Sequence, residues 1–252
     1  MKHHFLDRYS DADGPLHGVD PRIKILAILM LVACAVTTPP RAQAAFAVYG
    51  ALVAAAVVAS RVPVLHFVKS LAAVLPFAVA IAAFLPFMPK AGDAVGLGPL
   101  VLSQTGLWRF AAAVEKSLLG VSCAVLLVST TRFPKLLSAL AGLGLPRPFV
   151  TMLSFAYRYA FVTTDELERM LRARRARLSE AGMKVRYGSL GQLAGTLFVR
   201  SYERAERIYA AMVARGWSGT PPRQPSPRLA AADLALFCAA SGAAVAARVF
   251  LR

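Results

Sequence analysis

The residues of this sequence whose type and spacing suggest a binding function are its arginines. Residues 169–177 contain five arginines, and a further one, Arg215, stands between Ala214 and Gly216. The planar guanidinium group makes paired hydrogen bonds to carboxylates, and small neighbours allow it to enter a groove on a partner protein. These arginines fit such docking and fit a solvated or lipid-facing surface equally well. Nucleic-acid binding is disfavoured, since no aromatic residues are interleaved with the basic ones.

Sequence patterns of enzymes and cofactor sites are absent. There is no G-x-x-x-x-G-K-[ST] loop, no G-x-G-x-x-G before a helix, and no nucleophile with a matching histidine. Ligand types for a metal occur near the N-terminus without a fixed spacing, at His3, His4, His17, Asp7, Asp11 and Asp13. We therefore predict no catalytic residues, no cofactor and no metal ligands.

The composition excludes an ordinary soluble domain. Hydrophobic residues make up 57% of the 252 residues and charged residues 17%, and the mean hydropathy is +0.56. A soluble domain carries about 25% charged residues and roughly 45–50% apolar ones. Such an apolar excess cannot be buried in one 26.9 kDa globule, so the sequence predicts a membrane protein.

Five apolar stretches are candidates for crossing the bilayer, which takes roughly 17–25 residues per helix. They are residues 23–38, 42–59, 67–88, 107–130 and 229–249, the third with Pro76 and Pro86 inside it. The predicted fold class is all-α, a polytopic membrane protein with about five transmembrane helices. The predicted organisation is residues 1–130 with four spans, 131–228 with a cytoplasmic pair or trio of long helices, and 229–252 with the last span.

Residues 131–228 differ from the rest in charge. They contain 17 Lys+Arg and 6 Asp+Glu, a net of +11. The positive-inside rule puts this segment, and with it the N-terminus, on the cytoplasmic side. Two helices are expected in it, at 149–178 and 190–214, with Gly182 and Gly188 breaking the chain between them and Gly216 stopping the second.

Charged residues also fall inside the fourth predicted span. Arg109, Glu115 and Lys116 precede an uncharged run, 117–131, that is too short to span alone. Glu115 and Lys116 are therefore expected to face a neighbouring helix or the head groups. The alternative is a stand-alone ion permease or channel whose pore these charges line, because intramembrane charges are functional suspects.

Two motifs resemble a known family. The string Leu-His-x-x-Asp-Pro-Arg-x-Lys at 16–24, and residues 200–216 ending in Ala-Arg-Gly, resemble the transmembrane component of energy-coupling factor transporters, and within it the cobalt-uptake branch, CbiQ. The resemblance implies a non-catalytic scaffold in the cell (inner) membrane. It also implies CbiO-like ATPase partners, a CbiM-like substrate-binding membrane subunit with or without CbiN, and a transition metal cargo, most readily cobalt.

The resemblance further implies two short motifs that dock onto the ATPases. The second is Ala214-Arg215-Gly216. The first is best placed at Ala176-Arg177-Leu178, because Asp165-Glu166 stands upstream as the Asp-Glu pair of the family does. Leu178 departs from the glycine common in the family, so Arg174 and Arg175 remain alternatives to Arg177.

Overall fold

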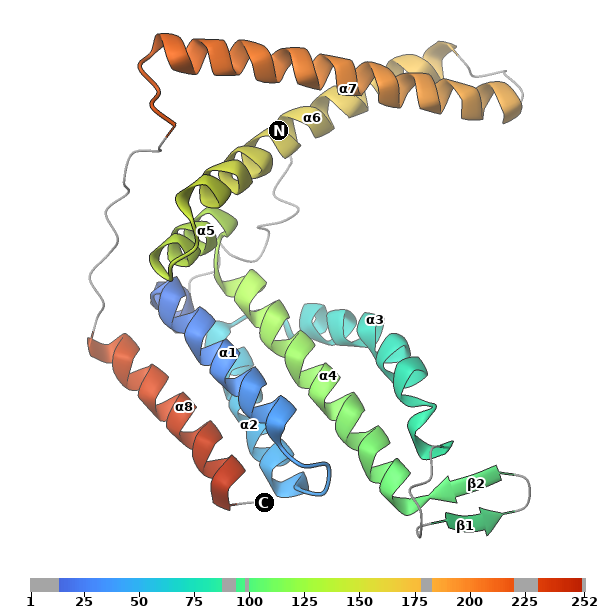
Figure 1. Cartoon of the computed structure of the whole chain (residues 1–252), viewed down its shortest axis with the longest axis vertical. Coiled ribbons are helices and arrows are strands. Elements are labelled where there is room, and N and C mark those ends of the chain that lie inside the picture. The colour runs from blue at the N-terminus through green and yellow to red at the C-terminus, as the bar shows by residue number, and fades with distance from the viewer. Residues whose placement is uncertain (1–13, 88–93, 98–99, 178–182, 220–230, 251–252) are drawn as a thin grey trace. The chain divides into compact units, whose positions relative to one another are not determined.

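The structure is a computed structural model that describes residues 14–87, 94–97, 100–177, 183–219 and 231–250. These residues form eight α-helices, two short 3-10 helices and one β-hairpin (Figure 1). The prediction of a helical chain is therefore confirmed, and the hairpin is an addition that the sequence did not predict.

The α-helices coincide with the apolar and amphipathic stretches of the sequence. They are α1 (Pro21–Thr37), α2 (Gln43–Ser60), α3 (Val64–Ala82), α4 (Gln104–Thr130), α5 (Phe133–Gly142), α6 (Arg147–Arg177), α7 (Met183–Ala214) and α8 (Ala231–Phe250). The long cytoplasmic helices predicted from the sequence correspond to α6 and α7. The ten-residue α5 was not predicted, although Pro134 at its second position suits a first helical turn.

The third apolar stretch is not one continuous helix. α3 ends at Ala82, and a separate 3-10 helix, η2, covers Leu85–Phe87. Pro76 lies inside α3 as predicted, whereas Pro86 lies beyond the end of α3, within η2. The hairpin follows, with β1 (Ala94–Leu97) antiparallel to β2 (Leu100–Ser103).

The prediction that Gly188 breaks the chain before α7 is wrong. Gly188 lies within α7, which begins at Met183 rather than at residue 190. One glycine costs a helix only about 0.5–1 kcal/mol relative to alanine, and the other residues of a 32-residue helix outweigh that cost. Gly182, the other predicted break, lies outside the described residues.

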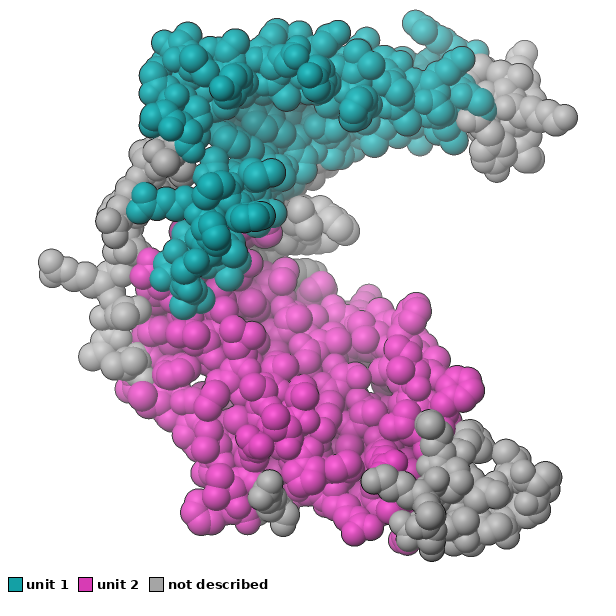
Figure 2. Space-filling view, viewed as in Figure 1, with its two compact units in different colours: residues 1, 140–225 teal, residues 2–139, 226–252 magenta. Residues whose placement is uncertain are grey.

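The chain divides into two compact units (Figure 2). One comprises residues 140–225 and contains α6 and α7; the other comprises residues 2–139 and 226–252 and contains α1 to α4 and α8. We call them the helical-pair unit and the multi-helix unit. The core of the multi-helix unit centres on Tyr49, whose fully buried hydroxyl shares a 3.1 Å hydrogen bond with the Thr38 hydroxyl.

Three helices among the described residues are long and apolar enough to cross a membrane, namely α2, α3 and α4. α1 is also apolar but has 17 residues, and the described apolar part of α8 is Phe237–Phe250. Only about a ninth of the most apolar 18-residue stretch of α3 is buried, and the helix carries the exposed side chains of Phe77 and Ile81. Such a surface suits lipid, and the five spans predicted from the sequence stay a prediction in their exact number.

Candidate functional site

The first predicted docking motif lies at the end of α6. Arg177 is the last residue of that helix, and its side chain, like those of Arg175 and Ala176, is exposed. Arg174 differs, because its Nε donates a 2.7 Å hydrogen bond to the Ser189 hydroxyl on α7 and its side chain is half-buried. Leu178 lies outside the described residues. Arg175 and Arg177 are therefore the arginines of this motif with the more exposed side chains.

The second motif forms the end of α7. Arg215 follows the last helical residue, and Gly216 has a φ of +80°, in the left-handed region that glycine adopts without strain. Gly216 donates its amide hydrogen to the Val213 carbonyl at 2.9 Å, and Trp217 donates its own to the Met212 carbonyl at 3.0 Å. These two bonds form a Schellman motif, which ends the helix and leaves the Arg215 side chain exposed.

Trp217 fixes this end of α7 onto α6. Its ring lies against that of Phe155, with 6.2 Å between ring centroids and 62° between ring planes. This edge-to-face arrangement is favourable beyond the apolar area it buries. The residue after the Ala-Arg-Gly motif therefore ties the motif to the neighbouring helix. This role of Trp217 was not predicted from the sequence, although a tryptophan directly after a helix-stopping glycine is a signal for it.

Glu166 joins α6 to α7 at their middle. Its carboxylate lies 2.9 Å from Arg200, 3.0 Å from Arg204 and 3.0 Å from Arg169, and its side chain is only 14% exposed. Hydrogen bonds from Arg200, Arg169 and Arg204 lower the pKa of the Glu166 carboxyl from 4.5 to about 2. The carboxylate is therefore ionised throughout the neutral and mildly acidic range. We call these four residues the Glu166 cluster.

Each of the two motifs lies at the same sequence separation from a residue of the Glu166 cluster. The contacts of Phe155 with Trp217, of Glu166 with Arg204 and of Arg174 with Ser189 show that α6 and α7 run in opposite directions (Figure 1). Arg177 follows Glu166 by eleven residues, and Arg215 follows Arg204 by eleven. At 1.5 Å per residue, Arg177 lies about 17 Å along α6 from Glu166, and Arg215 lies about 17 Å along α7 from Arg204, in the opposite direction.

The charges of the fourth span occupy the multi-helix unit. Lys116 on α4 donates hydrogen bonds from Nζ to the carbonyls of Val36 at 2.7 Å and Thr38 at 2.9 Å, at the C-terminal end of α1. Its ammonium also lies 5.9 Å from the Phe46 ring centroid, within cation–π range. These contacts are those of a packing residue, in agreement with the expectation that Lys116 faces a neighbouring helix. Arg109 is half-buried.

A second lysine makes the reciprocal contact. Lys24, near the start of α1, donates from Nζ to the Thr130 carbonyl at 3.1 Å and to the Thr131 hydroxyl at 3.3 Å, at the end of α4. Each helix of this antiparallel pair thus supplies a cation to the C-terminal end of the other, where unpaired carbonyls and the helix dipole favour positive charge. Asp20 caps the start of α1, since its side chain accepts a hydrogen bond from the Arg22 amide.

The described part of the chain contains no group of side chains suited to hold a metal ion. There, no three histidine, cysteine, aspartate or glutamate side chains are grouped so that they could hold a metal ion. Among the ligand types near the N-terminus, His3, His4, Asp7, Asp11 and Asp13 lie outside the described residues, as does the side chain of His17.

An apolar helical unit with lysine-capped helices, joined to a basic pair of long helices, is the architecture of a multi-pass helical membrane protein. A family model described as "Cobalt transport protein", CbiQ, matches residues 13–227. The chain belongs to this CbiQ/EcfT family, the transmembrane components of energy-coupling factor transporters. The prediction of a non-catalytic transmembrane component is confirmed by this membership.

Two relatives that match most of the chain carry names of the same class. The chain is similar to the cobalt transport protein CbiQ of Rhodobacter capsulatus, at 31% identity over 84% of each chain. It is also similar to the energy-coupling factor transporter transmembrane protein EcfT of Listeria innocua, at 29% identity over 87% of this chain and 86% of that one. Two uncharacterized proteins of Methanocaldococcus jannaschii are 36% and 37% identical over 100 residues, and the match covers 34% and 37% of their lengths.

Proposed function

We propose that this chain is the coupling subunit of an ATP-driven importer. It binds cytoplasmic ATPases through α6 and α7, and it transmits their motion to a separate membrane subunit that captures the substrate. In this arrangement residues 131–228 and the N-terminus lie in the cytoplasm. The names of the family and of the relatives support cobalt as the cargo before other transition metals, and a relative named as a fused CbiMQ supports a CbiM-like subunit as a partner. CbiO-like ATPases and CbiN complete the proposal on the family resemblance of the two sequence motifs.

The observation that carries the proposal is the placement of two exposed arginines on either side of the Glu166 cluster. Two sites at opposite ends of the helix pair suit a pair of ATPase domains, with one arginine for each. When the two domains move on binding or hydrolysing ATP, the arginines move with them, and the cluster makes α6 and α7 respond as one body. Coupling then consists of contacts that differ between two states of the complex.

Purification of the tagged chain tests the proposal against a stand-alone permease. We expect an ATPase and a second membrane subunit to co-purify with the chain, and we expect the chain alone to transport no metal in liposomes. Transport by the lone chain would contradict the proposal. The contacts of Lys116 with helix-end carbonyls favour the coupling subunit, because they occupy a charge that a pore would use.

A further inference from the structure

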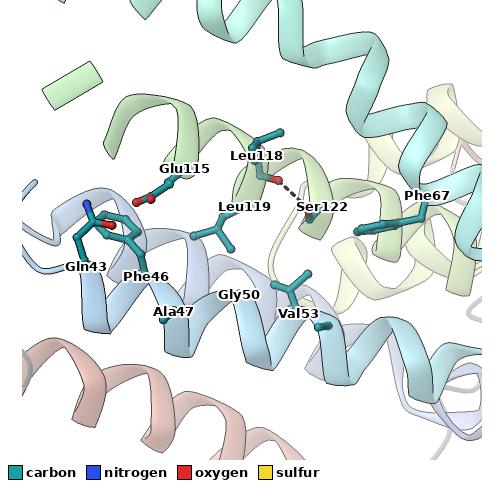
Figure 3. A pocket seen from close by; sticks show the side chains of 11 residues that line it. Gln43, Phe46, Ala47, Gly50, Val53, Phe67, Glu115, Leu118, Leu119 and Ser122 are labelled. Atoms are coloured by element: carbon teal, nitrogen blue, oxygen red, sulfur yellow. Dashed lines mark hydrogen bonds between the residues drawn. The ribbon is translucent and has the colours of Figure 1, made fainter. Parts of the chain in front are cut away.

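A groove of about 400 Å³ lies between α2 and α4 in the multi-helix unit (Figure 3). Gln43 and Glu115 lie toward one end of it and Phe67 of α3 at the other, with small residues of α2 along the floor. The groove is open to the surroundings rather than enclosed. Its size is that of a site for a few side chains, since a whole α-helix is about 10–12 Å across.

The α2 side of the groove is unfilled. Gly50 and Ala54 both line it, four residues apart and hence on one face of the helix. A Cβ atom built on Gly50 would meet nothing within 4 Å outside its own stretch of helix, so the space beside this glycine has room for a side chain. Small residues at this spacing allow the close approach of another helix in a membrane.

The α4 side of the groove carries a buried carboxyl oxygen that has no hydrogen-bond partner among the described residues. Glu115 Oε2 is buried, and no described residue donates a hydrogen bond to it. The neighbouring Lys116 does not supply one, because its Nζ points to the end of α1. A carboxylate among apolar helices is costly unless a cation or donor accompanies it. A lipid tail would fill the apolar end of the groove and leave this oxygen unpaired.

We propose that the groove binds a transmembrane helix of the separate membrane subunit, which places a lysine or arginine against Glu115 and a small residue against Gly50. This inference rests on the proposed function and adds to it the surface that holds that subunit within the membrane. The groove receives side chains of the docked helix, while the helix itself lies along α2 and α4. Charge complementarity to Glu115 selects the occupant, and Gly50 sets how close it comes.

A photo-cross-linking residue at Ala54 tests the inference in the assembled complex. The chain is expressed with its ATPases and its substrate-binding membrane subunit, irradiated in the membrane, and analysed by mass spectrometry. We expect cross-links to a transmembrane segment of the substrate-binding subunit. Glu115→Gln, which keeps the shape, and Gly50→Leu, which fills the groove, should each reduce the cross-linked yield roughly three- to thirtyfold. Gly120→Leu is the matched control, since Gly120 has equal room but does not line the groove.

Three results would overturn the inference: cross-links to lipid alone, cross-links to a second copy of this chain, or a yield that neither variant changes. If Gly50→Leu fails to reach the membrane, the isosteric Glu115→Gln decides the matter alone. ATPase recovered in the same preparation reports separately on the proposed function. A complex that keeps its ATPases but shows no subunit at Ala54 would therefore refute the groove and leave the coupling role standing.

Discussion

Glu166 on α6 and Arg204 on α7 bind each other at 3.0 Å, and each is followed, eleven residues later, by a candidate docking arginine. The bond fixes where the two long helices meet, so it also fixes the separation of Arg177 and Arg215. A carboxylate shared by three arginines holds this meeting point more firmly than a single exposed ion pair does, because the exposed pair is weakened by water and salt.

Glu166→Gln should loosen the helix pair without unfolding either helix. Spin labels at Ala176 and Ala214 would give a narrow distance distribution in the parent chain and a broad one in the variant. Glu168→Gln is the control, since the Glu168 side chain is 54% exposed and pairs with Arg172 of its own helix at 3.4 Å. An unchanged distribution in Glu166→Gln would show that other contacts set the geometry.

The distance distribution between the spin labels at Ala176 and Ala214 should change with pH only in strong acid. The pKa of Glu166 is lowered to about 2 in the folded chain from the ordinary 4.5. Its contribution is therefore complete above about pH 4.5 and is lost as the pH falls toward 2. We expect the distances to stay constant from pH 8 to pH 5 and to broaden only in stronger acid. Broadening between pH 7 and 5 would point to a different group.

Two glycines of the α7 segment should respond to alanine with opposite signs. Gly216→Ala forces a side chain into the left-handed region and should destabilise the end of α7 by about 1–2 kcal/mol. Gly188→Ala should stabilise α7 by about 0.5–1 kcal/mol, because Gly188 is helical and exposed, and an added Cβ meets nothing. Hydrogen exchange of α7 amides would measure both. Equal effects of the two changes would contradict the assigned cap.

The reciprocal lysines should stabilise the multi-helix unit. Lys24→Met and Lys116→Met each leave helix-end carbonyls without their charged donor, which should lower the free energy of unfolding by roughly 1–3 kcal/mol. Lys69→Met, at an exposed lysine of α3, should have little effect. Unfolding in mixed detergent micelles provides the measurement. A changed metal preference at normal protein level, in place of lost stability, would revive the permease.

The topology predicts that α7 is reachable only from the cytoplasm. After replacement of Cys34, Cys123 and Cys238, a cysteine at the exposed Ala210 should resist a membrane-impermeant thiol reagent in intact cells and react once the cells are opened. A cysteine at Ser103, in the hairpin, should react in intact cells. The reverse pattern would overturn the proposed orientation.

Sequence patterns predicted a helix end well where the signal for it lies in a few adjacent residues. Gly216 marked the end of α7 correctly, because a helix cap depends on adjacent residues only. Asp20 before Pro21 carries the same kind of local signal for the start of α1. Gly188 was misjudged because helix breaking by one glycine depends on the length and packing of the whole helix. The hairpin escaped prediction because strand pairing depends on residues across a turn rather than on a local period.

The contacts of the candidate site were less predictable than its residues. The sequence named Arg177 and Arg215 by resemblance, but nothing local to them shows that Glu166 meets Arg200 and Arg204, which lie more than thirty residues away. The same holds for Lys24 and Thr130, which are 106 residues apart. Long-range pairs require the fold, whereas capping residues and apolar stretches do not.

The central claim is that Arg177 and Arg215 bind the ATPases. The amount of ATPase that co-purifies with the Arg177→Ala/Arg215→Ala double variant tests this claim most directly. Removing an arginine from a buried charged pair costs roughly 2–5 kcal/mol, so each change should weaken ATPase binding by more than an order of magnitude. Lysine at both positions should rescue in part, because it cannot make the forked bonds. The control is Arg172→Ala/Arg207→Ala, at exposed arginines paired within their own helices. The account predicts a membrane-inserted chain that recovers almost no ATPase and supports almost no uptake, and undiminished recovery and uptake would contradict it.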